Sequence, residues 1–146
     1  MRIAIASDQG GFCQKDLIID FVRGLGHEVE DFGPADAGRV DYPDFASPVA
    51  HAVSEGRADR GILICGTGIG MALTADKVPG VRAAPINRPD FARLFRQHND
   101  GNVIGLSGRF VAPMDNCELV RIFLETDFDG GRHCQRVEKI MREDAR

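Results

Sequence analysis

Cys65 stands where an apolar run meets a glycine-rich loop, in the stretch GILICGTGIGMAL (residues 61–73). The run suits a buried strand, and the residues after the loop suit the first turn of a helix. Backbone amides at a helix N-terminus favour an anion or a developing oxyanion, and the same setting favours the thiolate form of a cysteine. The stretch therefore predicts a base beside an oxyanion site, to which the hydroxyl of Thr67 adds a donor.

A nucleotide-binding turn with an incidental cysteine is the alternative interpretation of this loop. The dinucleotide pattern GxGxxG is absent, because Met71 stands where its last glycine would be. The loop by itself does not decide between the two interpretations.

Polar residues elsewhere in the chain also suit a binding site. His98 and Asn99 lie in RQHNDGN, a polar turn before an apolar run, where a histidine either acts in a site or caps a helix. Asp8 ends the first apolar run and suits a helix cap or a contact with a sugar hydroxyl. Arg132 and Arg136 are four residues apart, so they share one helical face and form either a phosphate clamp or a solvated surface.

Apolar runs of strand length alternate with amphipathic segments of helix length along the chain. This alternation predicts one α/β domain over residues 1–146, a Rossmann-like doubly wound sheet of five parallel strands with helices on both faces. Ligands of such sheets bind at the carboxyl ends of the strands, so we expect these ends and residues 97–100 to meet at one cleft. The expected strands are residues 3–7, 27–32, 61–65, 81–84 and 102–106. The expected helices are residues 12–24, 43–56, 68–77, 90–99, 113–125 and 132–143.

The composition excludes several classes of partner. A net charge of −4 over 146 residues argues against a nucleic acid or a membrane surface, which would require a basic patch. Any bound anion must therefore be held by local cations. No segment has the pattern of a signal peptide or a membrane span. The four cysteines lack the spacing of metal ligands, which predicts reduced thiols in a cytoplasmic protein.

Six stretches, spread over nearly the whole chain, occur in the order typical of one family: IAIASDQGGF, GHEVEDFGP, VDYPDFA, ADRGILICGTGIGMALTADKVPGVRAA, RQHNDGNVIGLSGR and FDGGRHCQRVEKI. Together they resemble the ribose-5-phosphate isomerase B family, which includes the galactose-6-phosphate isomerase subunits. The resemblance implies aldose–ketose isomerisation of a phosphorylated sugar without a metal or other cofactor. It also implies a homodimer, or alternatively a tetramer, with active sites at the subunit interface and the helix at 132–143 near that interface.

By this resemblance, Cys65 is the catalytic base that moves a proton between C2 and C1 of the sugar through a cis-enediolate. Thr67 and the loop amides hold the enediolate oxygen, and His98 opens the sugar ring by proton transfer. One branch of the family instead places a glutamate after the last loop glycine, where this chain has Met71, which cannot take a proton. The loop residues are Gly66, Gly68, Ile69 and Gly70.

The resemblance also assigns the residues that bind substrate. Asp8 and Asn99 match contacts with sugar hydroxyls. Gln9 stands where the family usually has a histidine that helps to bind phosphate, so this position donates a hydrogen bond without a charge. The segment PINRPDF, residues 85–91, departs from the relatives, and its Pro85, Asn87 and Arg88 are expected either to reshape the sugar pocket or to add a cation to it. Arginines match the phosphate ligands, some of them expected from the partner subunit: Arg109, Arg132 and Arg136.

The leading hypothesis is interconversion of D-ribose 5-phosphate and D-ribulose 5-phosphate, as in the pentose phosphate pathway. Because of Gln9 and residues 85–91, the alternative is the same chemistry on another phosphosugar. That sugar would be a tetrose such as erythrulose or erythrose 4-phosphate, or a hexose such as galactose or allose 6-phosphate. A phosphosugar-binding module without catalysis is a third hypothesis, against which Cys65, Thr67 and His98 count. A flavodoxin-like nucleotide binder is the last.

Overall fold

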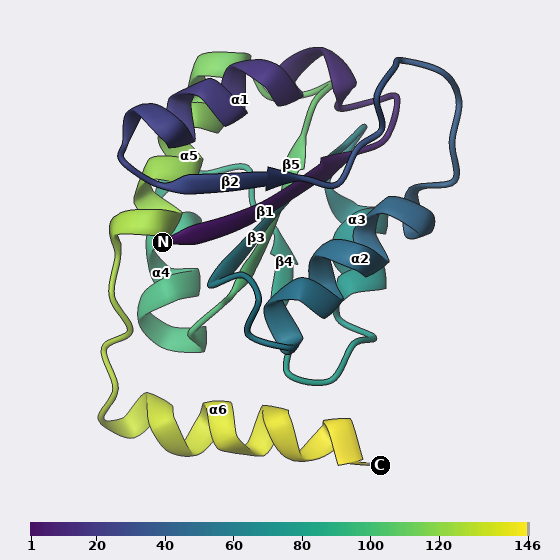
Figure 1. The fold of residues 1–146 in the computed structure, drawn as a ribbon. Coiled ribbons are helices and arrows are strands. Elements are labelled where there is room, and N and C mark those ends of the chain that lie inside the picture. The colour runs from purple at the N-terminus through teal and green to yellow at the C-terminus, as the bar shows by residue number, and fades with distance from the viewer. Residues whose placement is uncertain (146) are drawn as a thin grey trace.

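Five parallel strands form one sheet in the computed structural model, which describes residues 1–145 (Figure 1). The strand order is β2-β1-β3-β5-β4, so the chain reverses its direction of growth across the sheet after β2. All four pairings are parallel, which confirms the predicted doubly wound sheet. The strands are β1 (Arg2–Ser7), β2 (Glu28–Asp31), β3 (Arg60–Cys65), β4 (Ala83–Pro85) and β5 (Val103–Ser107).

Helices cover both faces of the sheet (Figure 1). One face packs against α1, α4 and α5, and the other against α2 and α3. Helix α6 lies apart from both layers, along the lower side of the molecule in Figure 1. The helices are α1 (Phe12–Gly24), α2 (Tyr42–Ser54), α3 (Ile69–Ala75), α4 (Pro89–Asn99), α5 (Pro113–Glu125) and α6 (Arg132–Arg142), followed by the 3-10 turn η1 (Glu143–Ala145).

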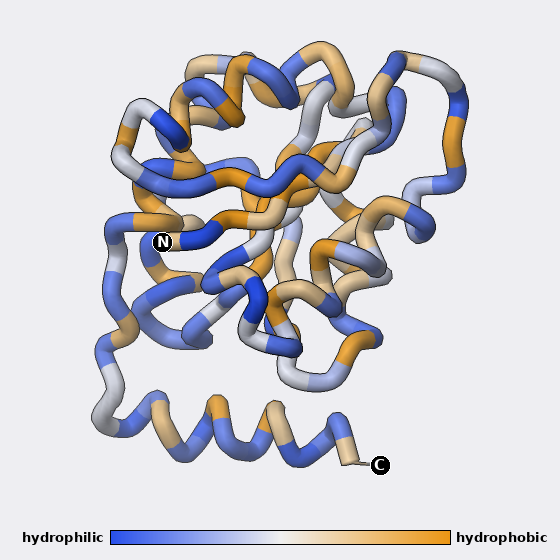
Figure 2. The backbone as a smooth tube through the Cα atoms, viewed as in Figure 1, coloured by the Kyte–Doolittle hydropathy of each residue, from blue (hydrophilic) through white to orange (hydrophobic). Residues whose placement is uncertain are grey.

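The two cores follow from the alternation of side chains along each strand. Ile62 and Ile64 of β3 face α1, α4 and α5, whereas Leu63 and Cys65 face α2 and α3. All four are buried. Apolar residues accordingly gather along the central strands, whereas β2 and α6 are mostly hydrophilic with isolated apolar residues (Figure 2). The alternation of side chains along β3 thus places Cys65 at the carboxyl end of the strand, on the side of the sheet that faces α2 and α3.

Contacts at both ends of helix α6 join it to the rest of the chain. At its start, the ring of His133 stacks on that of His98 in α4. Beyond its end, the Asp144 carboxylate accepts a hydrogen bond of 2.8 Å from the Gly80 amide. Met141 accepts a hydrogen bond from Arg82 at 3.2 Å. Between these contacts α6 is largely exposed. Within residues 1–145, none of the helices has the length and apolar character of a membrane span.

The element boundaries agree with the predicted ones to within a few residues. The largest difference concerns α3, which has seven residues where ten were expected. The edge strands β2 and β4 are also shorter than expected, with four and three residues. Few interstrand hydrogen bonds hold an edge strand, so its apolar pattern extends beyond the residues that pair.

Candidate active site

Three loops meet at the carboxyl edge of the sheet, after β1, β3 and β5. A β-carbon on Gly10 would lie 2.7 Å from the amide nitrogen of Gly66, so a side chain there would push the first two loops apart. The hydroxyl of Ser107 donates a hydrogen bond of 2.7 Å to the Gly66 carbonyl and joins the third loop to the second. This close approach of backbones forms a rigid base for the residues that follow each strand.

Cys65 is the last residue of β3 and is 4% exposed. Its Sγ accepts a hydrogen bond of 3.2 Å from the Gly68 amide. Gly68 adopts φ = +81°, and a β-carbon on it would lie 2.9 Å from the backbone of Gly105. The turn therefore requires glycine. Its amide is aimed at the sulfur, where it stabilises a negative charge.

The loop after Cys65 presents further donors. Thr67 is exposed, and its Oγ1 accepts a hydrogen bond of 3.2 Å from the Ile69 amide, which leaves the hydroxyl proton available. Among residues 1–145, no acceptor engages the amides of Gly66 and Thr67. A pocket of about 300 Å³ adjoins them, lined by Thr67, Ile69, Asn87, Ser107, Phe110 and Val111.

Arg109 and Tyr42 flank the loop on two sides. A β-carbon on Gly66 would lie 3.2 Å from Nη1 of Arg109, and the Arg109 amide donates a hydrogen bond of 3.3 Å to the Gly66 carbonyl. A β-carbon on Gly70 would lie 2.8 Å from the ring of Tyr42. The sequence pattern did not point to a role for Tyr42. Its position in the stretch VDYPDFA was the available signal.

Asp8 and Gln9 follow β1 at the same edge. Asp8 is 7% exposed and accepts a hydrogen bond of 2.7 Å from the Gly10 amide. The helix-cap alternative for Asp8 is wrong, because α1 begins after Gly11 without a side-chain cap. The Oε1 atom of Gln9 accepts a hydrogen bond of 3.1 Å from the Val40 amide, so Gln9 anchors the loop at 33–41.

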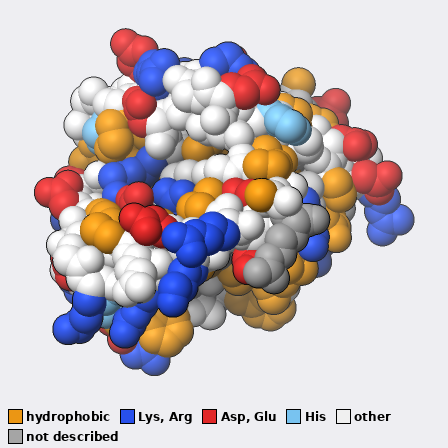
Figure 3. Space-filling model, turned by 90° about the horizontal axis from the view of Figure 1, so that it is seen from below, with side chains coloured by type: hydrophobic (Ala, Val, Ile, Leu, Met, Phe, Trp, Pro, Cys, Tyr) orange, Lys and Arg blue, Asp and Glu red, His pale blue; other side chains and the backbone are white. Residues whose placement is uncertain are grey.

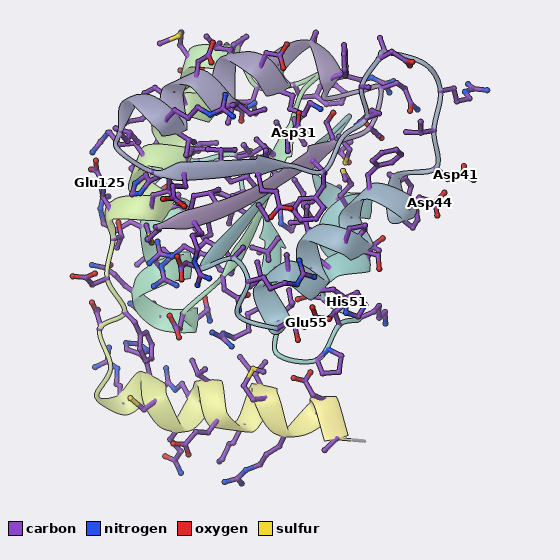
Figure 4. All side chains as sticks on the ribbon, viewed as in Figure 1. Asp31, Asp41, Asp44, His51, Glu55 and Glu125 are labelled. Carbon is purple, nitrogen blue, oxygen red and sulfur yellow. The ribbon has the colours of Figure 1, made fainter. Side chains whose placement is uncertain are left out.

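A buried lysine holds the other end of this loop. Lys15 is 2% exposed and donates hydrogen bonds of 2.9 Å to Asp31 and 2.7 Å to the Pro34 carbonyl. Asp31 lies at the end of β2, between α1 and the sheet (Figure 4). Two side chains, Gln9 and Lys15, therefore determine where the loop lies relative to the Cys65 turn.

His98 and Asn99 lie at the opposite edge of the sheet. Helix α4 leads into β5, so its last turn lies where the parallel strands begin, whereas Cys65 lies where they end. Arg82, which precedes β4, accordingly bonds to Asp100. A six-residue strand spans about 20 Å. The prediction that residues 97–100 share one cleft with the strand ends is therefore wrong for a single chain.

Arg132 and Arg136 are exposed on α6, on the same side as His98. The rings of His98 and His133 are stacked with centroids 4.3 Å apart and an interplanar angle of 12°. From the side of α6, basic side chains gather on this face among scattered acidic ones (Figure 3). The predicted residues thus form two groups. One holds Asp8, Gln9, Cys65, Thr67 and Arg109, and the other holds His98, Asn99, Arg132 and Arg136.

The sequence profile of the Ribose/Galactose Isomerase family matches residues 3–140. This chain belongs to that family. Among curated relatives in the ribose/galactose isomerase family, ribose-5-phosphate isomerase B of Escherichia coli is 44% identical, over 95% of this chain and 93% of the relative. D-erythrulose-4-phosphate isomerase of Pectobacterium atrosepticum is 38% identical, over 96% of this chain and 93% of the relative. The chain is accordingly a sugar-phosphate isomerase.

Solved structures of ribose/galactose isomerases share the fold along the whole chain. Clostridium thermocellum ribose-5-phosphate isomerase B is 46% identical, with a TM-score of 0.97 over 99% of this chain and 98% of that one. The Mycoplasma genitalium enzyme with bound ribulose 5-phosphate is 44% identical, with a TM-score of 0.94 over 99% and 96%. These values confirm the predicted fold class and family.

One set of side chains in this ribose/galactose isomerase has the composition of a metal site. The ligand atoms of His98, Asp129 and His133 lie within 4.8 Å of one another. However, the lone pair of an imidazole nitrogen lies in the ring plane. Two nearly parallel rings 4.3 Å apart therefore direct their lone pairs side by side and not toward a common point. The set does not suit a single ion.

The other two histidines have structural contacts. His51 lies 3.7 Å from Glu55 on the outer side of α2 (Figure 4). Nδ1 of His27 lies 3.1 Å from the amino group of Met1.

Proposed function

We propose that the enzyme interconverts D-ribose 5-phosphate and D-ribulose 5-phosphate, with Cys65 as the base. The observation that carries this proposal is the turn that ends β3. In this turn the Cys65 sulfur accepts a hydrogen bond from the Gly68 amide. The amides of Gly66 and Thr67 follow Cys65 in the same turn, and no acceptor within residues 1–145 bonds to them. A base next to free donors is the arrangement that enolisation requires, because the oxygen beside the reacting carbon becomes negative.

The first step in the aldose-to-ketose direction is opening of the furanose ring. The C1–O4 bond breaks, O4 takes a proton from the imidazolium of His98, and the O1 hydroxyl loses its proton to solvent as the aldehyde forms. His98 then regains a proton from solvent. Histidine suits this role because its side chain exchanges a proton near neutral pH.

Isomerisation follows at the group of residues that contains Cys65 and Thr67. The Cys65 thiolate takes the proton from C2, a C1–C2 double bond forms, and O1 becomes an oxyanion held by the loop amides and the Thr67 hydroxyl. The proton of the O2 hydroxyl passes to O1. The Cys65 thiol, whose proton exchanges with solvent while the enediolate is bound, then donates a proton to C1, and C2 becomes the ketone. Because the sulfur gives up one proton for each proton that it takes, no net acid or base is consumed.

We infer that each complete site combines the Cys65 edge of one chain with the His98 edge of a second copy. The separation of the two groups within one chain supports this inference. Exposed apolar side chains beside the Cys65 loop offer a surface for the second copy. Phe110 is 79% exposed and Leu73 is 60% exposed, and Phe110 shares a pocket with Ile69. A two-fold dimer would then hold two sites.

The phosphate is proposed to bind Arg109 of one chain together with Arg132 and Arg136 of the other. All three are exposed, and none forms an ion pair within residues 1–145, so each guanidinium has donors available for a dianion. In a chain with a net charge of −4, such local cations are needed to attract the phosphate. The proposed location is the cytoplasm, whose reducing conditions keep the Cys65 thiol free.

A tetrose 4-phosphate is the second candidate substrate. It is favoured by the 38% identity to D-erythrulose-4-phosphate isomerase and by Gln9, which carries no charge for the phosphate. Asn87 lines the same pocket as Thr67, so residues 85–91 border the expected sugar site. The choice of substrate therefore depends on two positions, 9 and 87.

A substrate panel and a proton-exchange assay test the proposal together. We expect kcat/KM for ribose 5-phosphate to exceed that for four- and six-carbon aldose phosphates. In D2O, C1 of ribulose 5-phosphate should gain deuterium. Cys65→Ala should reduce this exchange by about 10²- to 10⁴-fold, whereas the exposed Cys13→Ala should leave it unchanged. A preference for a tetrose phosphate would overturn the substrate, and exchange that survives in Cys65→Ala would overturn the base.

A further inference from the structure

His133 is the one buried residue of α6, and its sequence setting predicted no functional role. It is 6% exposed, although it lies between the exposed residues Arg132 and Cys134. Its ring covers that of His98, with centroids 4.3 Å apart and planes 12° apart. The buried face of α6 is therefore used at this point to contact a residue with a proposed role in proton transfer.

Backbone contacts join the surroundings of the two rings into one unit. The Asp129 amide, in the segment before α6, donates a hydrogen bond of 3.0 Å to the carbonyl of Gln97, which precedes His98. One oxygen of the Asp129 carboxylate lies within 4.8 Å of one nitrogen of each imidazole. Within residues 1–145 the His98 side chain forms no hydrogen bond, so the stack is the contact that orients its ring.

Burial and the neighbouring charges act on the protonated form of His133. Burial lowers the pKa of His133 below 6.5, and the neighbouring charges of His98, Arg132 and Arg136 lower it further, whereas Asp129 opposes them. Two imidazolium rings 4.3 Å apart would also repel each other. These effects favour a neutral His133 ring against that of the half-buried His98.

We propose that His133 is a positioning residue, a platform whose ring orients the stacked His98 ring for proton transfer during ring opening. This proposal rests on the proposed function, in which His98 protonates the ring oxygen. Stacking fixes the tilt of the imidazole, and proton transfer requires such alignment, since small displacements of a catalytic group reduce rates strongly.

The chemistry of the two substrates isolates this role. Ribose 5-phosphate closes a five-membered ring through O4 and must be opened before it reacts. Ribulose 5-phosphate would close such a ring only through O5, which is esterified, so it remains open-chain. Exchange of its C1 hydrogen with solvent requires Cys65 and phosphate binding but no ring opening. A residue that acts through His98 should therefore affect the first substrate and spare the second.

The experiment compares three variants with the wild-type enzyme. His133→Leu removes the stacked ring, His133→Phe keeps a flat ring without nitrogens, and Gln135→Leu introduces leucine at an exposed position of the same helix. For each, kcat/KM is measured with ribose 5-phosphate, and C1 deuterium exchange is measured with ribulose 5-phosphate. We expect His133→Leu to lower kcat/KM by about 10- to 100-fold while exchange stays within about twofold of the wild-type rate. His133→Phe should recover kcat/KM to within about threefold, and Gln135→Leu should match the wild type.

Several outcomes would overturn the positioning role. Equal losses of turnover and exchange in His133→Leu would mean that His133 only supports α6 and its arginines. Unchanged kcat/KM in His133→Leu would mean that the stack has no part in ring opening, and a loss in His133→Phe as large as in His133→Leu would refute stacking as its basis. Failure of the proposed function is distinguishable, because the wild-type protein would then neither turn over ribose 5-phosphate nor exchange the C1 hydrogen of ribulose 5-phosphate.

Discussion

Cys65 and His98 lie at opposite ends of the strands of one parallel sheet, Cys65 where the strands end and His98 where they begin. Cys65 ends β3, and His98 lies in the last turn of α4, the helix that leads into β5. Because β3 and β5 pair in parallel, the end of one strand and the approach to the other are separated by the length of a strand. Neither edge alone offers both a base and a ring-opening acid, so the proposed reaction requires two chains.

Mixing two inactive variants tests this arrangement. Cys65→Ala and His98→Asn should each have little activity with ribose 5-phosphate. After the two are unfolded together and refolded, hybrid dimers contain one site built from the two unaltered edges. Random pairing should restore about a quarter of wild-type activity per subunit. The kcat of the mixture is compared with that of each variant refolded alone. Activity that stays at the level of the separate variants would place the whole site within one chain.

Substitutions of Gln9 separate its hydrogen bond with the Val40 amide from its expected contact with the phosphate. Gln9→Ala removes the acceptor for the Val40 amide and should raise the KM for ribose 5-phosphate about fivefold, the effect of losing about 1 kcal/mol. Gln9→Glu keeps an acceptor for that amide but adds a negative charge beside the phosphate. We expect Gln9→Glu to raise KM more than Gln9→Ala does. A KM for Gln9→Glu close to the wild-type value would mean that Gln9 serves only as the loop anchor.

Arg96 should be the main stabiliser of the His98 edge. It is 5% exposed, and its guanidinium bonds to the Asp100 carboxylate at 2.9 Å and to the Thr126 carbonyl at 3.2 Å. Arg96→Met should lower the free energy of unfolding by about 2–4 kcal/mol, because it removes the ion pair with Asp100 and leaves the buried carbonyl of Gly101 without the guanidinium donor. Urea denaturation measures the loss. Arg93→Met, on the exposed side of α4, should change stability by less than about 0.5 kcal/mol, and equal effects of the two would contradict this role.

The stability of the folded chain should fall as the pH drops below about 6.5, in part because of His133. Its pKa is lowered in the folded state by burial and by nearby cations, so the unfolded chain takes up the proton first. The contribution is fully present above the unfolded pKa and is lost as the pH falls toward the folded one. The free energy of unfolding, measured between about pH 7 and pH 5, should therefore decline less steeply in His133→Phe than in the wild type. Gln135→Phe, at an exposed position of the same helix without a titratable group, should follow the wild-type slope, and identical slopes for all three proteins would exclude His133 as a source.

Much of the site was predictable because it is local in sequence. Cys65, Thr67 and Gly68 lie within one turn, so the pattern of strand, cysteine and glycine loop places the sulfur and the amides together whatever the rest of the chain does. The Asp8 carboxylate likewise bonds to an amide two residues away. The paired spacing of Arg132 and Arg136 also predicted a helix with both on one face.

The sequence by itself determined the alternation of strands and helices, the parallel sheet and the local geometry of the Cys65 turn, because periodicity and glycine geometry act over a few residues. Only the tertiary structure decided that His98 stands at the far edge, that His133 covers its ring, and that Gln9 holds the loop at Val40. These relations join residues that are distant in the chain. They depend on the direction in which each helix returns to the sheet, and no local pattern encodes that direction.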